Sequence, residues 1–220
     1  MIKALFLVFD PTASWETIVS RKRSWQVILA TYLFPLWLIA AAAEFYGLVH
    51  WGKPRGFLGE LKTLPNSEAL LFEILQLGLQ MVLVFTGARM ILALGETFHG
   101  RNTFGQAFTV TAYGLAPAFT LRILDIFPGI SGWLYWVTWA VGIVLTTSIL
   151  YHGIPKVMLP DPPHAFGMYL TSSILLVMIS GLIRFITFTF LQGKLVKLEE
   201  LMEKITAHLP FLQSFNQIHF

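Results

Sequence analysis

Five long apolar stretches dominate the sequence and decide what it can fold into. They run over Trp25–Val49, Ala69–Leu94, Phe104–Phe127, Ser131–Tyr151 and Phe166–Gln192. A helix needs about 20 apolar residues to cross a hydrocarbon layer ~30 Å thick. The stretches lack the alternation of a membrane β-strand, and a helix satisfies its own backbone hydrogen bonds in lipid. The sequence therefore predicts an all-α polytopic membrane protein, with a bundle of five transmembrane helices over residues 25–192.

The amino-acid composition agrees with this prediction and argues against several other classes. Of the 220 residues only 12% are charged and 55% are hydrophobic, whereas soluble domains carry about 25% charged residues. The net charge of +3 comes without a basic stripe interleaved with aromatics, so we expect no nucleic-acid partner. The chain has no cysteine, which removes disulfides, thiolate metal sites and thiol nucleophiles.

The charges around the first span predict its orientation. A basic triplet, residues 21–23, directly precedes this span, and such residues stay preferentially on the cytoplasmic side. The N-terminus is therefore expected in the cytoplasm and, after five crossings, the C-terminus outside. One group of residues argues against this orientation, because the same alternation places it in an outside loop: Lys53, Arg55 and Lys62.

Amphipathic segments flank the spans at both ends of the chain. Within residues 1–24, Pro11 starts a short helix that presents Trp15, Ile18 and Val19 on one face, as in an anchor among lipid headgroups. Within residues 193–220, apolar residues recur at intervals of three and four from Leu195 to Leu209. This second surface helix could lie on the membrane or join two copies of the chain.

Aromatic residues gather at the predicted outer end of the fourth span. Such residues favour the interface between lipid and water, so we expect an interfacial belt. A stacking site for a ligand is the alternative. The residues are Trp133, Tyr135, Trp136 and Trp139.

Seven polar residues lie inside or near the ends of the predicted spans. Each ionisable residue in a bilayer costs roughly 2.5–3.5 kcal/mol and so calls for a partner or a function. Arg122 and Asp125 are three apart and could pair on one helix face. The set could pin the spans together, line a path for ions or protons, or snorkel to the headgroups. It comprises Glu44, Glu73, Gln76, Gln80, Arg122, Asp125 and Arg184.

A second polar group lies toward the opposite membrane face. Two of its members, an acid and a histidine three residues later, share a helical face, and their side chains suit Zn²⁺ or another divalent metal. Histidines in surface loops are also commonly solvated, and we expect no other cofactor. The candidate metal ligands are Glu96, His99, His152, Asp161 and His164.

Gly114 and Pro117 interrupt the third span. Proline removes a backbone hydrogen bond and favours a kink. These residues could form a turn with close helix packing, or a hinge that flexes during transport. A Pro-Gly turn at residues 128–132 then predicts that spans three and four form an antiparallel hairpin.

Common catalytic signatures are missing from the sequence. It contains no zinc-protease His-Glu-x-x-His, no Gly-x-Ser-x-Gly, no phosphate-binding glycine loop and no dinucleotide fingerprint. Three serines of the fifth span have no histidine nearby in sequence and are typical of helix packing: Ser172, Ser173 and Ser180. We therefore expect no enzymatic activity.

Three local motifs resemble those of one family. "LVFDPTASWETIV" precedes the first span, "ETFHGRNTFGQAFTVTAYGLAP" enters the third, and "YHG" ends the fourth. Together with the five spans, they make the chain similar to the YIP family of Ypt/Rab-interacting membrane proteins over nearly its whole length. The shorter prokaryotic members resemble it most.

The resemblance implies a cytosolic N-terminus and protein partners in the membrane. Eukaryotic members associate with one another and with Rab GTPases in vesicle traffic. This chain departs from them, because only about 24 residues precede its first span and an acidic GTPase-associated segment has no clear counterpart. We therefore expect a bacterial or archaeal plasma (inner) membrane and doubt a Rab partner.

Three functional hypotheses follow. The first is a YIP-like scaffold that organises membrane lipid or a membrane-protein partner and self-associates as a homo-oligomer. The alternative is a small ion, proton or solute transporter or channel that uses the intramembrane acids and arginines. The third is a divalent-metal-binding membrane protein.

Overall fold

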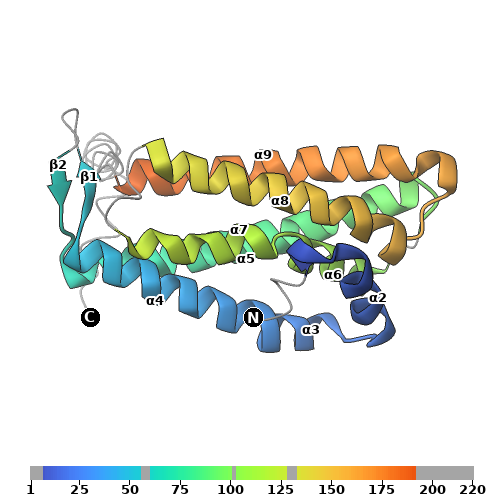
Figure 1. Ribbon diagram of the computed structural model, residues 1–220, viewed down its shortest axis with the longest axis horizontal. Coiled ribbons are helices and arrows are strands. Elements are labelled where there is room, and N and C mark those ends of the chain that lie inside the picture. The colour runs from blue at the N-terminus through green and yellow to red at the C-terminus, as the bar shows by residue number, and fades with distance from the viewer. Residues whose placement is uncertain (1–6, 56–59, 101–102, 128–132, 192–220) are drawn as a thin grey trace, which may run out of the picture.

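The five predicted spans form five helical segments that run alongside one another (Figure 1). The computed structural model describes residues 7–55, 60–100, 103–127 and 133–191. Within them, the segments long and apolar enough to cross a membrane are Trp25–His50, Asn66–Thr97, Phe104–Ile126, Tyr135–Val157 and Pro162–Leu191. The prediction of an all-α polytopic membrane protein is therefore confirmed. The largest difference is in the fourth span, which continues beyond Tyr151 to Val157.

The first span changes its helical geometry near its start. It consists of α3 (Trp25–Ile28), a π-helical turn (Leu29–Leu33) and α4 (Phe34–His50). Pro35 lies in the first turn of α4 and has no N–H to donate to the preceding turn. A π turn placed just before it absorbs this irregularity without ending the span.

A small β-hairpin, which the sequence analysis did not predict, joins the first two spans. Strand β1 (Lys53–Arg55) pairs antiparallel with β2 (Glu60–Lys62), and Lys53 lies opposite Lys62. Gly52 enters the hairpin with a φ of +76°, and a Cβ there would lie 2.4 Å from the Lys62 carbonyl oxygen. Only glycine fits this turn. We call this end of the bundle the hairpin end.

The third span is the most buried of the five and is broken in the middle. It comprises α6 (Phe104–Gly114), α7 (Ala116–Leu121) and the 3₁₀ helix η2 (Arg122–Ile126). The break at Leu115 comes two residues before Pro117, which has no N–H for the carbonyl of Tyr113. This span packs against α4, α5 (Asn66–Thr97) and α8 (Trp133–Val157). Of its most apolar 18 residues, 67% are buried, the highest share of the five.

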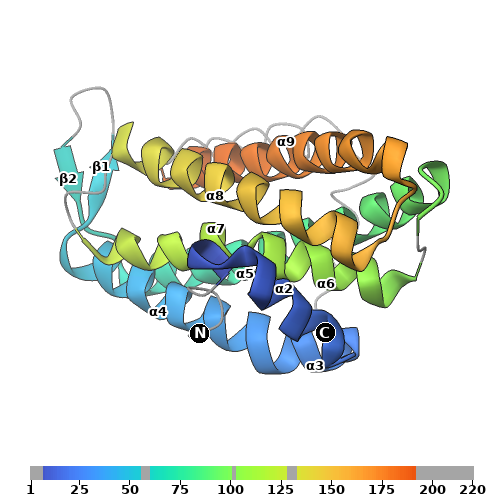
Figure 2. The same ribbon diagram turned by 45° about the vertical axis from the view of Figure 1, so that its right-hand side comes forward.

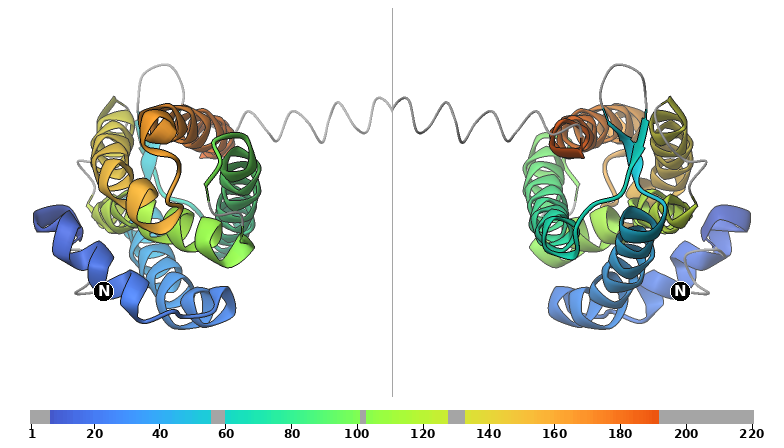
Figure 3. Two further views of the ribbon diagram at one scale, coloured as in Figure 1. Left: turned by 90° about the vertical axis from the view of Figure 1, so that its right-hand side faces the viewer. Right: turned by 90° about the vertical axis from the view of Figure 1, so that its left-hand side faces the viewer.

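The other helices lie to the sides of the third span or across the bundle from it (Figure 3). They are α5 (Asn66–Thr97), α8 (Trp133–Val157) and α9 (Ala165–Leu191), the last entered through the 3₁₀ turn η3 (Pro162–His164). Helix α9 packs against α5 and α8, while α4 lies on the outer side of the third span (Figure 2). Spans three and four are neighbours as expected, although the predicted turn at 128–132 lies outside the described residues.

Helix α2 (Pro11–Ser20) docks on the bundle beside α8. Asp10 caps it by accepting a hydrogen bond from the Ala13 N–H over 3.1 Å, and Pro11 starts it as predicted. The indole of Trp15 is fully buried and donates to the Ile149 carbonyl oxygen over 3.0 Å. The expected anchor among headgroups therefore needs correction, because its aromatic residue packs into protein.

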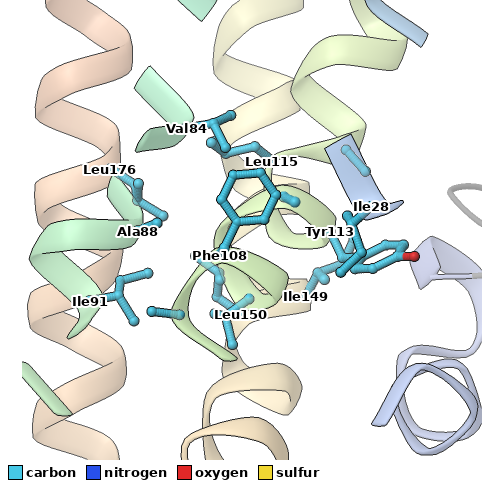
Figure 4. Close-up of a cluster of buried hydrophobic side chains, with 14 of the residues drawn as sticks. Ile28, Val84, Ala88, Ile91, Phe108, Tyr113, Leu115, Ile149, Leu150 and Leu176 are labelled. Atoms are coloured by element: carbon cyan, nitrogen blue, oxygen red, sulfur yellow. The ribbon is translucent and has the colours of Figure 1, made fainter. Parts of the chain in front are cut away.

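The apolar core surrounds Phe108 of α6 (Figure 4). Val84 and Ile91 of α5, Leu150 of α8 and Leu176 of α9 pack around it. This core extends from mid-span toward the end at which residues 21–23 lie, which we call the basic end. The predicted C-terminal helix in residues 193–220 lies outside the described residues.

Candidate functional site

Six charged side chains gather inside the bundle at its hairpin end. None of these side chains is more than 11% exposed, and acids and bases are equal in number. The formal charges of the group therefore cancel. This charged cluster comprises Glu44 of α4, Lys53 of β1, Glu73 of α5, Arg122 and Asp125 of η2, and Arg184 of α9.

Arg122 is the centre of one half of the charged cluster. Its Nε donates to Glu44 Oε2 over 2.7 Å, and its Nη2 donates to Glu73 Oε2. Gln76, one turn after Glu73, donates from Nε2 to the same Glu44 oxygen over 3.2 Å. One guanidinium therefore joins the first, second and third spans in an acid–base–acid arrangement.

Asp125 is the centre of the other half, with the opposite charge pattern. Its two carboxylate oxygens lie 3.8 Å from Lys53 Nζ and 3.8 Å from a terminal nitrogen of Arg184. This base–acid–base arrangement joins the hairpin, the third span and the fifth. The two halves also interact, because Glu44 lies within electrostatic range of Lys53 and Arg184.

The backbone of η2 places both centres on the same side. Residues three apart eclipse one another in a 3₁₀ helix, so Arg122 and Asp125 project in one direction as the sequence analysis expected. Each of them forms its ion pairs with residues of other elements, instead of the expected pair within one helix. The charged cluster therefore links elements that are distant in the sequence.

A glycine of the first span permits η2 to approach this closely. A Cβ built on Gly47 would lie 2.6 Å from the Asp125 carbonyl oxygen and 3.1 Å from the Ile126 Cα. Both are backbone atoms that cannot rotate away. Gly47 is therefore part of the reason why Glu44, one turn earlier on α4, reaches Arg122.

Tyr135 of α8 completes the surroundings of Arg184. The Arg184 guanidinium carbon lies 3.1 Å from the centroid of the Tyr135 ring, and a guanidinium nitrogen donates to the Tyr135 carbonyl oxygen over 2.7 Å. The Tyr135 hydroxyl and Thr187 Oγ1 are 3.0 Å apart. Tyr135 is 2% exposed, so its expected place in an interfacial aromatic belt was wrong.

Several oxygens of this region lack a hydrogen-bond donor among the residues that the structure describes. They are Glu44 Oε1, Glu73 Oε1, Gln80 Oε1 and both carboxylate oxygens of Asp125. Buried polar atoms usually have a partner. Gln76 and Gln80 are both buried and face the interior of the bundle. Gln76 also forms a hydrogen bond to Glu44 of the charged cluster.

Two contributors to this site were missed in the sequence. Lys53 was assigned to an outside loop, but the hairpin folds it into the bundle, where its side chain is 6% exposed. Tyr135 stood among three tryptophans near a span end. The sequence does not show which member of such a group faces inward, so no signal singled it out.

The structure does not bring the five candidate metal ligands together. Within the described residues, which include all five, no group of three or more histidine, aspartate or glutamate side chains could hold a metal ion. The rings of His99 and His164 approach each other, with centroids 6.1 Å apart. His152 Nδ1 instead lies 3.2 Å from the Ser148 carbonyl oxygen of its own helix, and Glu96 and Asp161 add no third ligand.

Gly114 and Pro117 flank the break in the third span. A Cβ on Gly114 would lie 2.6 Å from a methyl carbon of Leu150, so α6 packs closely on α8 at this point. The packing alternative is therefore present in the structure. Hinge motion at these two residues stays a prediction.

Comparison with known proteins places the chain in a family. The model of the Yip1 domain matches residues 5–195, which include the five spans and the whole charged cluster. A search of curated proteins and a search of solved structures found no match. Because the matched range is most of the 220-residue chain, this integral membrane protein belongs to the Yip1 domain family.

Proposed function

We propose that this protein is a membrane scaffold that binds copies of itself and other membrane proteins. The observation that supports this role is the charged cluster, in which each acid has a base within 4 Å. A conducting path would need ionisable groups that exchange with water. Paired and buried groups instead hold a rigid body together, since removing one partner of such a pair costs about 3–5 kcal/mol.

The outer face of α9 is the proposed surface for self-association. Of the most apolar 18 residues of α9, 22% are buried, which is the smallest share among the five spans. Its exposed large apolar residues recur every three or four positions and form one stripe along the helix. The stripe comprises Phe166, Leu170, Ile174, Met178, Leu182 and Phe185.

Counting labelled chains in a bilayer tests the scaffold role. The chain has no cysteine, so a single Met178→Cys variant, on a side chain 67% exposed, can be crosslinked without background. We expect a disulfide-linked dimer in liposomes at low protein density, and none from Leu176→Cys, whose side chain is 1% exposed. If chains that carry one fluorophore each appear as fluorescent spots that bleach in one step at all protein densities, self-association would be refuted.

The scaffold proposal includes an orientation with the N-terminus in the cytoplasm of a prokaryotic plasma membrane. Three exposed cations at residues 21–23 and Lys156 lie at the basic end. Lys53 no longer counts against this orientation, because Asp125 balances it inside the bundle. An impermeant thiol reagent applied to intact cells should leave a cysteine at position 22 unlabelled. Labelling at this position would show that the N-terminus faces the outside.

Proton or ion transport is the second candidate, and it is favoured by the carboxylate oxygens that accept no hydrogen bond from the described residues. Intramembrane acids of this kind serve as proton relays in pumps and transporters. Liposomes containing the purified chain should show no flux above empty vesicles if the scaffold proposal holds. Flux that disappears in Glu73→Gln, while the protein stays folded, would make transport the function.

A further inference from the structure

The strongest unassigned feature is a cavity at the basic end of the bundle. It has a volume of about 320 Å³ and lies between the end of α2, the start of α3, the first turns of α6 and the end of α8. This volume is at the lower end of the range typical of small-molecule sites. The cavity lies far along the spans from the charged cluster, and the two share no residue.

The lining of the cavity is strongly basic. Arg21, Lys22 and Arg23 all line it, and none of the described residues that line it is acidic. Lys22 has a φ of 42°, and its N–H donates to the Val19 carbonyl oxygen over 3.3 Å. This left-handed residue turns the chain between α2 and α3, and three consecutive cations line the same cavity.

Polar and apolar groups also line the cavity. Thr103, Gln106 and Thr109 supply hydroxyl and amide groups from the first turns of α6, where the helix dipole is positive. The buried side chains of Ile28 and Tyr113 lie against the remaining wall. A ligand that matches this lining carries both a negative group and an apolar part.

We propose that this cavity binds the headgroup of an anionic phospholipid. Phosphate suits the cations and hydroxyls, and the glycerol backbone suits the apolar wall. The cavity lies where the first, third and fourth spans begin or end, which is the depth of headgroups in a bilayer. This position favours a membrane lipid over a phosphate ion from solution.

Gly105 provides a way to fill the cavity without disturbing the protein. It lines the cavity, and a Cβ built on it meets no atom within 4 Å. Gly105→Leu therefore places an apolar side chain in open space, and leucine is also the better helix former. Gly78 of α5 has the same open surroundings and does not line the cavity, so Gly78→Leu is the matched control.

The test is retention of lipid by the purified full chain in detergent, measured by native mass spectrometry. Short-chain phosphatidylglycerol and phosphatidylcholine are offered in competition. We expect preferential retention of phosphatidylglycerol, lost in Gly105→Leu, kept in Gly78→Leu and reduced about fivefold for each cation removed in Arg21→Gln and Arg23→Gln. Retention that is equal for the two lipids, or unchanged in Gly105→Leu, would overturn the proposal.

A second measurement covers the case in which Gly105→Leu fails to fold. The Thr109→Cys variant should react with a thiol reagent, and phosphatidylglycerol should protect it from this reaction. Absence of protection would overturn the proposal. Protection by inorganic phosphate at concentrations as low as those of the lipid would also overturn it, because the site would then bind free phosphate and not a headgroup.

Discussion

Replacing Arg122 with methionine should strongly destabilise the bundle. In the wild type this side chain, 4% exposed, neutralises both Glu44 and Glu73. After the change, two buried carboxylates lose their common cation and the cluster carries three acids against two bases. Removing one partner of a buried pair costs about 3–5 kcal/mol, and we expect the free energy of unfolding to fall by that amount.

A charge-balanced variant separates the loss of charge balance from the loss of packing. Arg122→Met combined with Glu73→Gln leaves two acids and two bases. Glu44 then remains near Lys53 and Arg184, with which it already interacts. The combined loss of stability should be smaller than the sum of the single losses by about 0.5–3 kcal/mol, as for residues of one network.

The assay is reversible unfolding in mixed detergent micelles, followed by circular dichroism. Lys156→Met is the control, since the Lys156–Glu16 pair has the same 2.7 Å separation as Arg122–Glu44 but side chains 29% and 68% exposed. Its loss should stay below about 1 kcal/mol. If Arg122→Met costs no more than this control, the charged cluster is hydrated and our account of the bundle fails.

Three further changes test individual contacts. Gly47→Ala should destabilise the protein by about 1–3 kcal/mol through overpacking, because the added Cβ meets the Asp125 backbone. Gly78→Ala places its Cβ in open space and should leave the free energy of unfolding unchanged in the same assay. Equal losses of stability in the two variants would contradict the close approach at Gly47. Trp15→Ala should release α2 from α8, because it removes the buried indole and its hydrogen bond to the Ile149 carbonyl oxygen. Amide hydrogen exchange should then become faster over residues 11–20 only, and unchanged exchange would refute the docking role of Trp15. Tyr135→Phe should lower the free energy of unfolding by about 1 kcal/mol, because it removes one hydrogen bond. Tyr135→Leu should lower it further, because it also removes the ring that lies against the Arg184 guanidinium. Equal unfolding free energies for the two variants would show that the ring contributes nothing.

The sequence was sufficient to predict the spans because lipid leaves so few alternatives. A long apolar run must form a helix, and two of the five span starts, Trp25 and Phe104, agree to the residue. The β-hairpin escaped prediction, because strands of three residues have no useful periodicity. The π turn at Leu29–Leu33 was also missed, since Pro35 could equally have kinked or ended the helix.

The candidate site was predicted in its members but not in its pairing. Membrane depth alone indicated which ionisable residues lie at one level, and five of the six cluster residues were found in this way. Pairing depends on which spans are neighbours, and on the hairpin that brings in Lys53. Membrane depth also placed Glu96 and His152 at one level. His152 instead contacts the Ser148 carbonyl oxygen of its own helix, and within the described residues the two belong to no group that could hold a metal ion.

The order of charges along the chain has a consequence for how the protein is made. The cluster residues alternate in sign from the first to the last: Glu44, Lys53, Glu73, Arg122, Asp125 and Arg184. Chains emerge from the ribosome N-terminus first, so the net charge of the cluster residues made so far never exceeds one unit of either sign. Glu44 and Glu73 both precede Arg122, the base that pairs with them, and Lys53 between them keeps the net charge low until Arg122 is made. Arg184 is made last, so a chain that stops before the fifth span carries one net negative charge in the cluster, and Asp125 then has Lys53 as its only cluster base within 4 Å.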